Sequence, residues 1–170
     1  MKVVFDASVV LAILKEELGG DVGEKYLPNA LIPIVNFAEV ASCLGRENPP
    51  RSSLERSVRL FEKHVVPLDI KTSFEAGFIA GKTKHLGLSL GNRVCLTYGM
   101  VNKLLVYTAE KRWKEVDLPV EVRMIREFIP FPCFSGTRRK QQEPPYFLGG
   151  FLEQILTRCD HFYSLSCMAA

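Results

Sequence analysis

The stretch MKVVFDASVVLAIL, residues 1–14, decides the fold. Lys2–Phe5 is a short apolar run rich in β-branched residues, which is typical of a strand buried on both faces. Asp6, Ala7 and Ser8 follow at once, and the apolar run Val9–Leu14 then predicts a helix that Asp6 or Ser8 caps. A buried strand that turns directly into a helix indicates the first unit of a parallel α/β sheet.

The same alternation of strands and helices continues to about residue 127. Further strands are predicted at about 31–35, 65–68, 104–107 and 120–125. Helices are predicted at about 21–27, 36–45, 52–64, 73–85 and 90–102, with caps at Asn36 and Ser89. The sequence therefore predicts an α/β fold with a central parallel sheet that helices cover on both faces.

Composition limits the class of protein and divides the chain. The 170 residues carry a net charge of +3, which excludes a polybasic coat that binds nucleic acid by charge alone. Residues 1–127 read as one domain, whereas residues 128–170 are poor in charge, rich in aromatic residues, Pro and Gly, and without clear periodicity. We expect 128–170 to be an extension outside the domain, with a short helix conceivable at 146–156. A disordered extension, a segment docked over an apolar surface and a read-through product all stay open.

The cysteines and the apolar runs indicate the compartment. The cysteines are odd in number and have no zinc-motif spacing, which favours reduced thiols in a cytoplasm; they are Cys43, Cys95, Cys133, Cys159 and Cys167. The start of the chain lacks the features of a signal peptide, and no stretch reaches the ~18 apolar residues of a membrane span. We therefore expect a cytoplasmic protein without a membrane partner.

Four polar residues come to the carboxyl edge of the predicted sheet, where open parallel sheets bind ligands. Asp6 ends the first strand, Glu39 lies on the helix after the second, Asn92 opens the helix before the fourth, and Glu110 follows the fourth. Each residue alone also has a purely structural explanation. Asp6 could cap a helix, Glu39 could be an acid in a first helical turn, Asn92 could be a polar residue at a helix start, and Glu110 could be a solvated acid. Together they favour a cation site, and oxygen donors without nearby His or Cys select Mg²⁺ or Mn²⁺.

Several separated blocks of this sequence resemble one family. MKVVFDASVVLAILKEE, VNFAEVAS, TKHLGLSLGNRVCL, LLVYTAEKRW and VEVRMIRE look like the PIN domain of VapC-type toxins, over about residues 1–127. The resemblance implies a Rossmann-like α/β/α sandwich and a Mg²⁺- or Mn²⁺-dependent ribonuclease. It also implies the toxin half of a toxin–antitoxin pair, with RNA as substrate, a cognate antitoxin as partner, and a homodimer as the usual assembly.

The resemblance also assigns roles to site residues. It implies that Asp6 and Glu39 are the first and second acids, while Asn92 stands where the family has an Asp and Glu110 where it usually has an Asp. These four are the expected catalytic and metal-binding positions, with Ser8 and Thr108 as supporting hydroxyls that orient carboxylates or water. Asn92 removes one negative charge, so we expect weaker metal binding and attenuated cleavage.

Basic residues near the predicted site are candidates for binding RNA phosphates, although each could equally lie on a solvated helix face. The candidates are Lys84, Arg93 and Arg112, with Lys82, His85 and Lys111 close in sequence. Trp113 is expected to be a core or subunit-contact anchor rather than a base-stacking platform.

Other classes of protein fit less well. A haloacid-dehalogenase-like phosphatase needs an acid where this chain has Ser8, the acids and Lys of a response-regulator receiver are not evident, and no P-loop occurs. The serious rival is a catalytically inactive PIN domain that only binds RNA or its antitoxin, and Asn92 is the residue that favours it.

Overall fold

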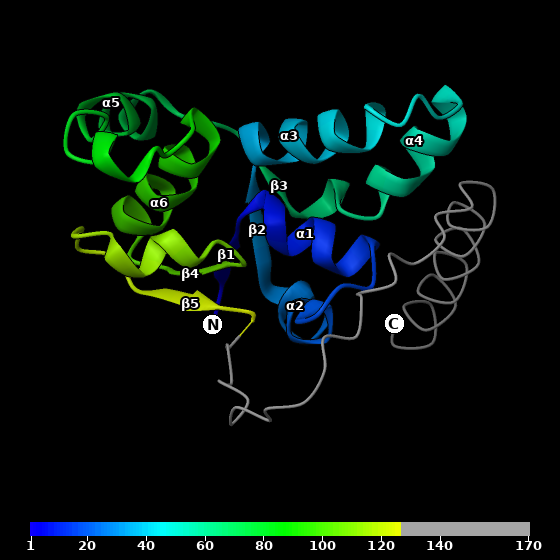
Figure 1. The fold of residues 1–170 in the computed structure, drawn as a ribbon, viewed down its shortest axis with the longest axis horizontal. Coiled ribbons are helices and arrows are strands. Elements are labelled where there is room, and N and C mark those ends of the chain that lie inside the picture. Colours follow the sequence, from blue (N-terminus) through cyan, green and yellow to red (C-terminus); the bar gives the residue numbers. More distant parts are fainter. Residues whose placement is uncertain (127–170) are drawn as a thin grey trace, which may run out of the picture. The chain divides into compact units, whose positions relative to one another are not determined.

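The computed structural model describes residues 1–126, in which five strands form one parallel sheet in the order β3-β2-β1-β4-β5 (Figure 1). The strands are β1 (Val3–Phe5), β2 (Ala30–Pro33), β3 (Val65–Val66), β4 (Leu105–Thr108) and β5 (Val122–Met124). The α-helices of the described part are α1 (Ala7–Leu14), α2 (Gly20–Tyr26), α3 (Ile34–Gly45), α4 (Arg51–Arg59), α5 (Ile70–Phe78) and α6 (Leu90–Asn102). The predicted parallel α/β class is confirmed.

The central strand β1 is buried on both faces, as its uninterrupted apolar sequence predicts. Val4 packs in a cluster with Cys95 and Leu96 of α6, on one face of the sheet. Phe5, the next residue along the strand, points to the other face and meets Tyr107 of β4 edge to face. Helices therefore cover both faces, and burial of this apolar surface is the main stabilising contribution.

The order of the strands places a crevice beside β1. The chain runs outward from β1 to β2 and β3, then returns to the other side of β1 to form β4. Such a reversal leaves a crevice at the carboxyl ends of the central strands, where the flanking connections leave in opposite directions. In Figure 1, α1, α3 and α6 meet around this end of the sheet. The polar residues predicted at the edge lie directly after β1, on α3, on α6 and shortly after β4.

Two helix starts differ from the prediction. The structure begins α3 at Ile34, with Pro33 in the capping position and no side-chain cap, so the prediction that Asn36 caps this helix is wrong. Asn36 is instead fully buried inside the first turn. The helix predicted at 73–85 begins earlier, at Ile70, because the carboxylate of Asp69 accepts from the backbone N–H of Thr72 at 2.7 Å.

Some predictions fall on residues that the structure does not describe. These are the extension at 128–170, the helix conceived at 146–156, and Cys133, Cys159 and Cys167, all of which lie outside residues 1–126. Within the described part, the thiols of Cys43 and Cys95 are free, and Cys95 is buried in the core. No helix among residues 1–126 combines the length and the apolar character needed to cross a bilayer.

Candidate functional site

The four predicted site residues line one small pocket at the carboxyl edge of the sheet. Its volume is about 150 Å³. The lining residues are Asp6, Ala7, Ser8, Leu11, Glu39, Cys43, Arg46, Asn92 and Glu110. The structure thus gathers side chains from the ends of two strands and from three helices around one space.

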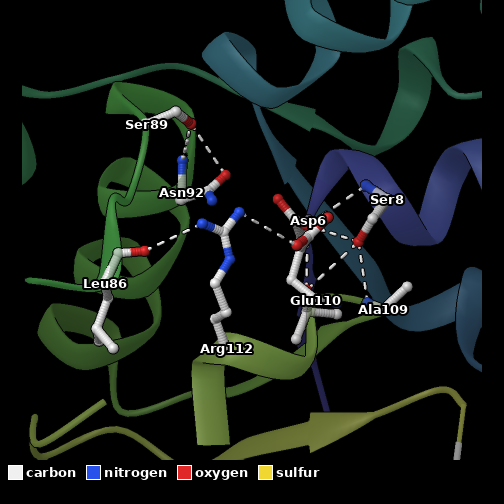
Figure 2. A network of polar contacts seen from close by, with 9 residues as sticks. Asp6, Ser8, Leu86, Ser89, Asn92, Ala109, Glu110 and Arg112 are labelled. Carbon is white, nitrogen blue, oxygen red and sulfur yellow. Dashed lines mark hydrogen bonds and ion pairs between the residues drawn. The ribbon is translucent and has the colours of Figure 1, made fainter. Parts of the chain in front are cut away.

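Asp6 is the most deeply placed of these residues, with 2% of its surface exposed. Its Oδ2 accepts hydrogen bonds from the hydroxyls of Ser8, at 2.6 Å, and Thr108, at 3.1 Å (Figure 2). The same oxygen accepts from the backbone N–H of Ser8, so Asp6 also caps α1. Burial raises the pKa of the Asp6 carboxyl, and these hydrogen bonds offset part of that rise.

Ser8 and Thr108 also connect the ends of β1 and β4. The Ser8 hydroxyl accepts from the backbone N–H of Ala109 at 2.9 Å, and that of Thr108 accepts from the backbone N–H of Glu110 at 3.0 Å. Each hydroxyl donates its proton to Asp6 and accepts from the segment that carries Glu110. The two predicted supporting residues therefore lie where they fix the relative positions of two carboxylates.

Glu39 reaches the pocket from the first half of α3 and lies over the N-terminus of α6. A Cβ atom added at Gly91 would sit only 2.5 Å from its Oε2 atom, so glycine at this position lets the carboxylate lie where it does without shifting. Partial burial raises the pKa of Glu39, and repulsion from Asp6 and Glu110 raises it further. The carboxylates of Asp6 and Glu110 thus repel that of Glu39 across the pocket.

Asn92 lines the pocket and also closes the start of α6. The Ser89 hydroxyl donates to its side-chain oxygen at 3.0 Å and accepts from its backbone N–H at 3.2 Å (Figure 2). Ser89 is therefore the N-cap of α6, and its hydroxyl bonds both the backbone and the side chain of Asn92. The oxygen that a cation could use is therefore already bonded to Ser89, and the position carries no charge.

Glu110 has a cation beside it. The Arg112 guanidinium lies 3.9 Å from its carboxylate and donates to the backbone carbonyl of Leu86 at 3.3 Å. In Figure 2 the guanidinium extends between Asn92 and the carboxylates of Asp6 and Glu110. Arg112 is thus held at the edge of the acidic cluster, from the 3₁₀ turn that follows β4.

The other predicted RNA-binding residues have different settings. The guanidinium of Arg93 donates to the backbone carbonyls of Ala76 in α5, at 3.0 Å, and of Leu88 in the loop before α6, at 2.8 Å. These bonds tie α6 to α5 and to that loop. Lys84 is exposed on a 3₁₀ turn and does not line the pocket. Arg93 therefore serves the fold, whatever else it contacts.

Sequence reasoning missed two residues at the site. Arg46 lines the pocket from the C-cap of α3, and its helical backbone and its spacing from Glu39 and Cys43, seven and three residues, place it on the same face as these two residues. Asn36, taken for a cap, instead donates its amide to Asp6. The helical spacing from Glu39 was the available signal for Arg46, whereas the contact of Asn36 depends on the packing of separate elements.

The chemical type of the donor atoms in the pocket suits a hard divalent cation. Carboxylate and amide oxygens are the ligands that Mg²⁺ and Mn²⁺ prefer, and His is absent from the pocket lining. Cys43 does line the pocket, so the expectation that no Cys lies near these donors is wrong. Among residues 1–126, however, no three His, Cys, Asp or Glu side chains are grouped closely enough to hold an ion as they stand. The pocket therefore offers donor atoms of a suitable kind, and they would have to move closer together to hold an ion.

Trp113 lies outside the pocket, in the core. It is 2% exposed and packs in the cluster that contains Leu86, Leu88 and Val106. This agrees with its predicted place as an anchor and removes it from contact with bases in solution. Its Nε1 atom has no hydrogen-bond partner among the described residues.

Comparisons with known proteins identify the fold. No family model matches the chain, and no curated protein matches its sequence. Among solved structures, a chain of a toxin–antitoxin complex from Klebsiella pneumoniae matches with a TM-score of 0.55 and 14% identity, over 71% of this chain and 99% of that one.

Two further matches describe complexes of the same kind. A chain of VapBC2 from Rickettsia felis, bound to a promoter DNA fragment, has a TM-score of 0.55 and 12% identity, over 73% of this chain and 98% of that one. A chain of VapBC-1 from nontypeable Haemophilus influenzae has a TM-score of 0.54 and 13% identity, over 74% and 98%. The described residues therefore have the PIN-like α/β/α fold that the sequence resemblance implies, the fold of chains in VapBC toxin–antitoxin complexes.

Proposed function

We propose that this protein is a VapC-type toxin, a Mg²⁺- or Mn²⁺-dependent endoribonuclease whose activity is attenuated by Asn92. The observation that carries this proposal is the pocket in which Asp6, Glu39 and Glu110 converge from separate elements at the carboxyl edge of a PIN-like sheet. A structural role alone does not explain why three carboxylates face one another there, because their repulsion costs stability without a cation.

The reaction is hydrolysis of an RNA phosphodiester. A water oxygen attacks the phosphorus, the bond from phosphorus to the 3′ oxygen breaks, and the 3′ oxygen takes up a proton, leaving a 5′-phosphate and a 3′-hydroxyl. When bound, the metal ion activates the water and stabilises charge on the phosphoryl oxygens. Asp6, Glu39 and Glu110 would hold it, with Asn92 as a neutral fourth donor.

The other residues of the pocket position these groups and the substrate. Ser8 and Thr108 fix the Asp6 carboxylate through hydrogen bonds of 2.6 and 3.1 Å. Arg46, directly after α3, and Arg112, after β4, place positive charge beside the acids, where they can hold the phosphates that flank the scissile bond. Lys84 and Arg93 extend this basic surface as weaker candidates.

A nuclease assay on RNA with Mn²⁺ tests the proposal, with native protein, Asp6→Asn and Asn92→Asp side by side. We expect slow cleavage by native protein, faster cleavage by Asn92→Asp, and none by Asp6→Asn or with EDTA. Cleavage that survives Asp6→Asn would assign the activity to another site or a contaminant. If neither native protein nor Asn92→Asp cleaves RNA, the proposed ribonuclease activity is contradicted.

The alternative is a catalytically inactive PIN domain that binds RNA or its antitoxin. The observation that favours it is that Asn92 is neutral and that its side-chain oxygen already accepts a hydrogen bond from Ser89. Thermal unfolding with and without Mn²⁺ separates the two. The enzyme requires that Mn²⁺ stabilises the native protein and not Asp6→Asn, whereas the inactive domain shows little shift in either.

We propose that a cognate antitoxin and a second copy of the chain are its protein partners. Support for the antitoxin comes from the matched structures, which are toxin–antitoxin complexes. Support for a homodimer comes from α5, where Ile70, Phe74 and Phe78 are 89%, 69% and 62% exposed and the two rings stack at 6.5 Å. Light scattering should give a dimer for the native protein and a monomer for Phe74→Glu; a monomeric native protein would contradict the assembly.

Two further points complete the proposal. We place the protein in the cytoplasm, which is supported by the free thiols of Cys43 and Cys95. We also propose that residues 128–170 are an extension and not part of the ribonuclease domain. Limited proteolysis of the full chain should leave a stable fragment that ends near residue 130, and full resistance through Ala170 would contradict this.

A further inference from the structure

Asn36 connects three of the four segments that carry the acids and the amide of the pocket. It lies in the first turn of α3, three residues before Glu39, and none of its surface is exposed. Its side-chain Nδ2 donates to Oδ1 of Asp6 at 3.1 Å and to the backbone carbonyl of Gly91 at 3.3 Å. Gly91 immediately precedes Asn92 in α6.

The orientation of this amide follows from its two partners. Both are acceptors, a carboxylate oxygen and a carbonyl oxygen, so only the NH₂ group satisfies them, one proton to each. A flipped amide would direct its own oxygen at two other oxygens. Asn36 is therefore a donor toward Asp6 and α6, and its two protons are both used.

The side-chain oxygen of Asn36 differs from its NH₂ group, whose two protons are both used. It is buried and has no hydrogen-bond partner among the described residues. A buried unpaired oxygen lowers stability, and an apolar side chain of similar size would avoid that loss. An amide at this position is thus poorly explained by packing, whereas the two donated hydrogen bonds explain it well.

The bonds of Asp6 show what Asn36 adds. Ser8 and Thr108 both donate to Oδ2 of Asp6, so these hydroxyls hold one oxygen of the carboxylate. Asn36, on α3, donates to the other oxygen, Oδ1. With Asn36 in place, side-chain hydrogen bonds restrict the carboxylate at both oxygens. The same amide fixes the backbone at Gly91, beside which Glu39 lies.

We propose that Asn36 is a positioning residue for the metal site, which sets Asp6 relative to Glu39 and Asn92 and thereby determines metal affinity. This inference rests on the proposed metal-dependent ribonuclease site. Groups that hold a metal ligand in place by hydrogen bonding typically change metal affinity about 10- to 100-fold when they are removed.

Mn²⁺ binding by calorimetry tests this with Asn36→Leu, which has similar volume and no donor. We expect affinity to fall about tenfold relative to native protein. Leu44→Ala, a buried change on the same helix with no polar contact to the pocket, serves as the control for lost stability. It should lower the melting temperature while Mn²⁺ affinity stays at the native value.

The outcomes separate this inference from the function on which it rests. Native protein that binds no Mn²⁺ in a manner abolished by Asp6→Asn overturns both. Native binding with an unchanged affinity in Asn36→Leu overturns the role of Asn36 and leaves the proposed function standing. An equal loss of affinity in Leu44→Ala would show that general loosening of α3 is the cause, and would also overturn it.

A second measurement uses the native chain and does not require the variant to fold. In ¹⁵N-labelled protein, the side-chain amide signal of Asn36 should shift progressively with Mg²⁺. The amide of Asn102, which donates to the Tyr98 carbonyl at the other end of α6, is the matched control and should not move. A stationary Asn36 signal while the Asn92 signal shifts would refute the contact between Asn36 and the site.

Discussion

The substitution Gly91→Ala should raise the stability of the protein and lower its affinity for metal. It therefore distinguishes the two properties more clearly than removal of a metal-binding side chain. Gly91 is the second residue of α6 and its φ is not positive, so alanine fits the backbone. Ala is favoured over Gly by about 1 kcal/mol in a helix interior, and we take roughly half of that for a first turn. The variant should therefore melt about 1–2 °C higher than native protein, without metal.

The same substitution displaces Glu39. The new Cβ would lie 2.5 Å from Oε2 of Glu39, whereas ordinary contact begins near 3.4 Å, so the carboxylate must retreat by the difference, about 0.9 Å. A unit charge ~4 Å from a divalent ion contributes about 2 kcal/mol in water and about 8 kcal/mol at an effective dielectric of 20. Moving it to ~4.9 Å removes close to a fifth of that, which corresponds to roughly a two- to tenfold loss of affinity.

Two measurements test the expected gain in stability and the expected loss of metal affinity. Thermal unfolding without metal gives the stability, and calorimetric titration with Mn²⁺ gives the affinity, each for native protein, Gly91→Ala and Gly77→Ala. Gly77 is the matched control, because it lies near the end of α5 and a Cβ there meets no atom within 4 Å. Gly77→Ala should bind Mn²⁺ like native protein. Native affinity in Gly91→Ala as well would show that Glu39 does not hold the ion from this position.

Three other changes have definite outcomes. Asn92→Asp should raise Mn²⁺ affinity at least tenfold in calorimetry, since it adds a carboxylate at the pocket; unchanged affinity would mean that Asn92 is not what weakens the site. The raised pKa of Glu39 means that its ionised form destabilises the fold at pH 7, a loss that disappears as pH falls below the ordinary value of 4.5. Glu39→Gln should therefore stabilise metal-free protein by up to about 1 kcal/mol at pH 7 and not at pH 4, in urea unfolding at both pH values. Trp113→Ala should cost about 3–5 kcal/mol in the same assay, and Trp113→Phe clearly less, because the indole N–H has no partner to lose among the described residues. Equal losses for the two would contradict this account of Trp113.

The class of the fold could be predicted from local pattern. The apolar run at Val3–Phe5 and the polar Asp6 after it specify a buried strand with a group at its carboxyl end, and each needs only the residues of one segment. Ser89 as the cap of α6 was likewise predictable, because capping is a contact between residues three apart.

The pocket lining could be predicted in part. Asp6, Glu39, Asn92 and Glu110 follow from the rule that parallel strands present their carboxyl ends at one edge, and they do line one pocket. Their use of hydrogen bonds could not be predicted. That Asn92 is bonded to Ser89 and Arg93 to two backbone carbonyls depends on side-chain geometry that sequence spacing leaves open.

Asn36 shows most clearly which features of the site the sequence pattern cannot predict. In the sequence it is a polar residue at the start of a helix, and such residues usually cap, so the local pattern indicates a cap. The tertiary structure decides otherwise, because the chain enters α3 at Pro33 and turns Asn36 inward against β1 and α6. The sequence by itself determines which segments are strands and helices, since these depend on periodic burial and local caps. Only the packing of separate elements decides which polar groups meet, because a hydrogen bond across 30 or 55 residues requires the whole sheet to be in place.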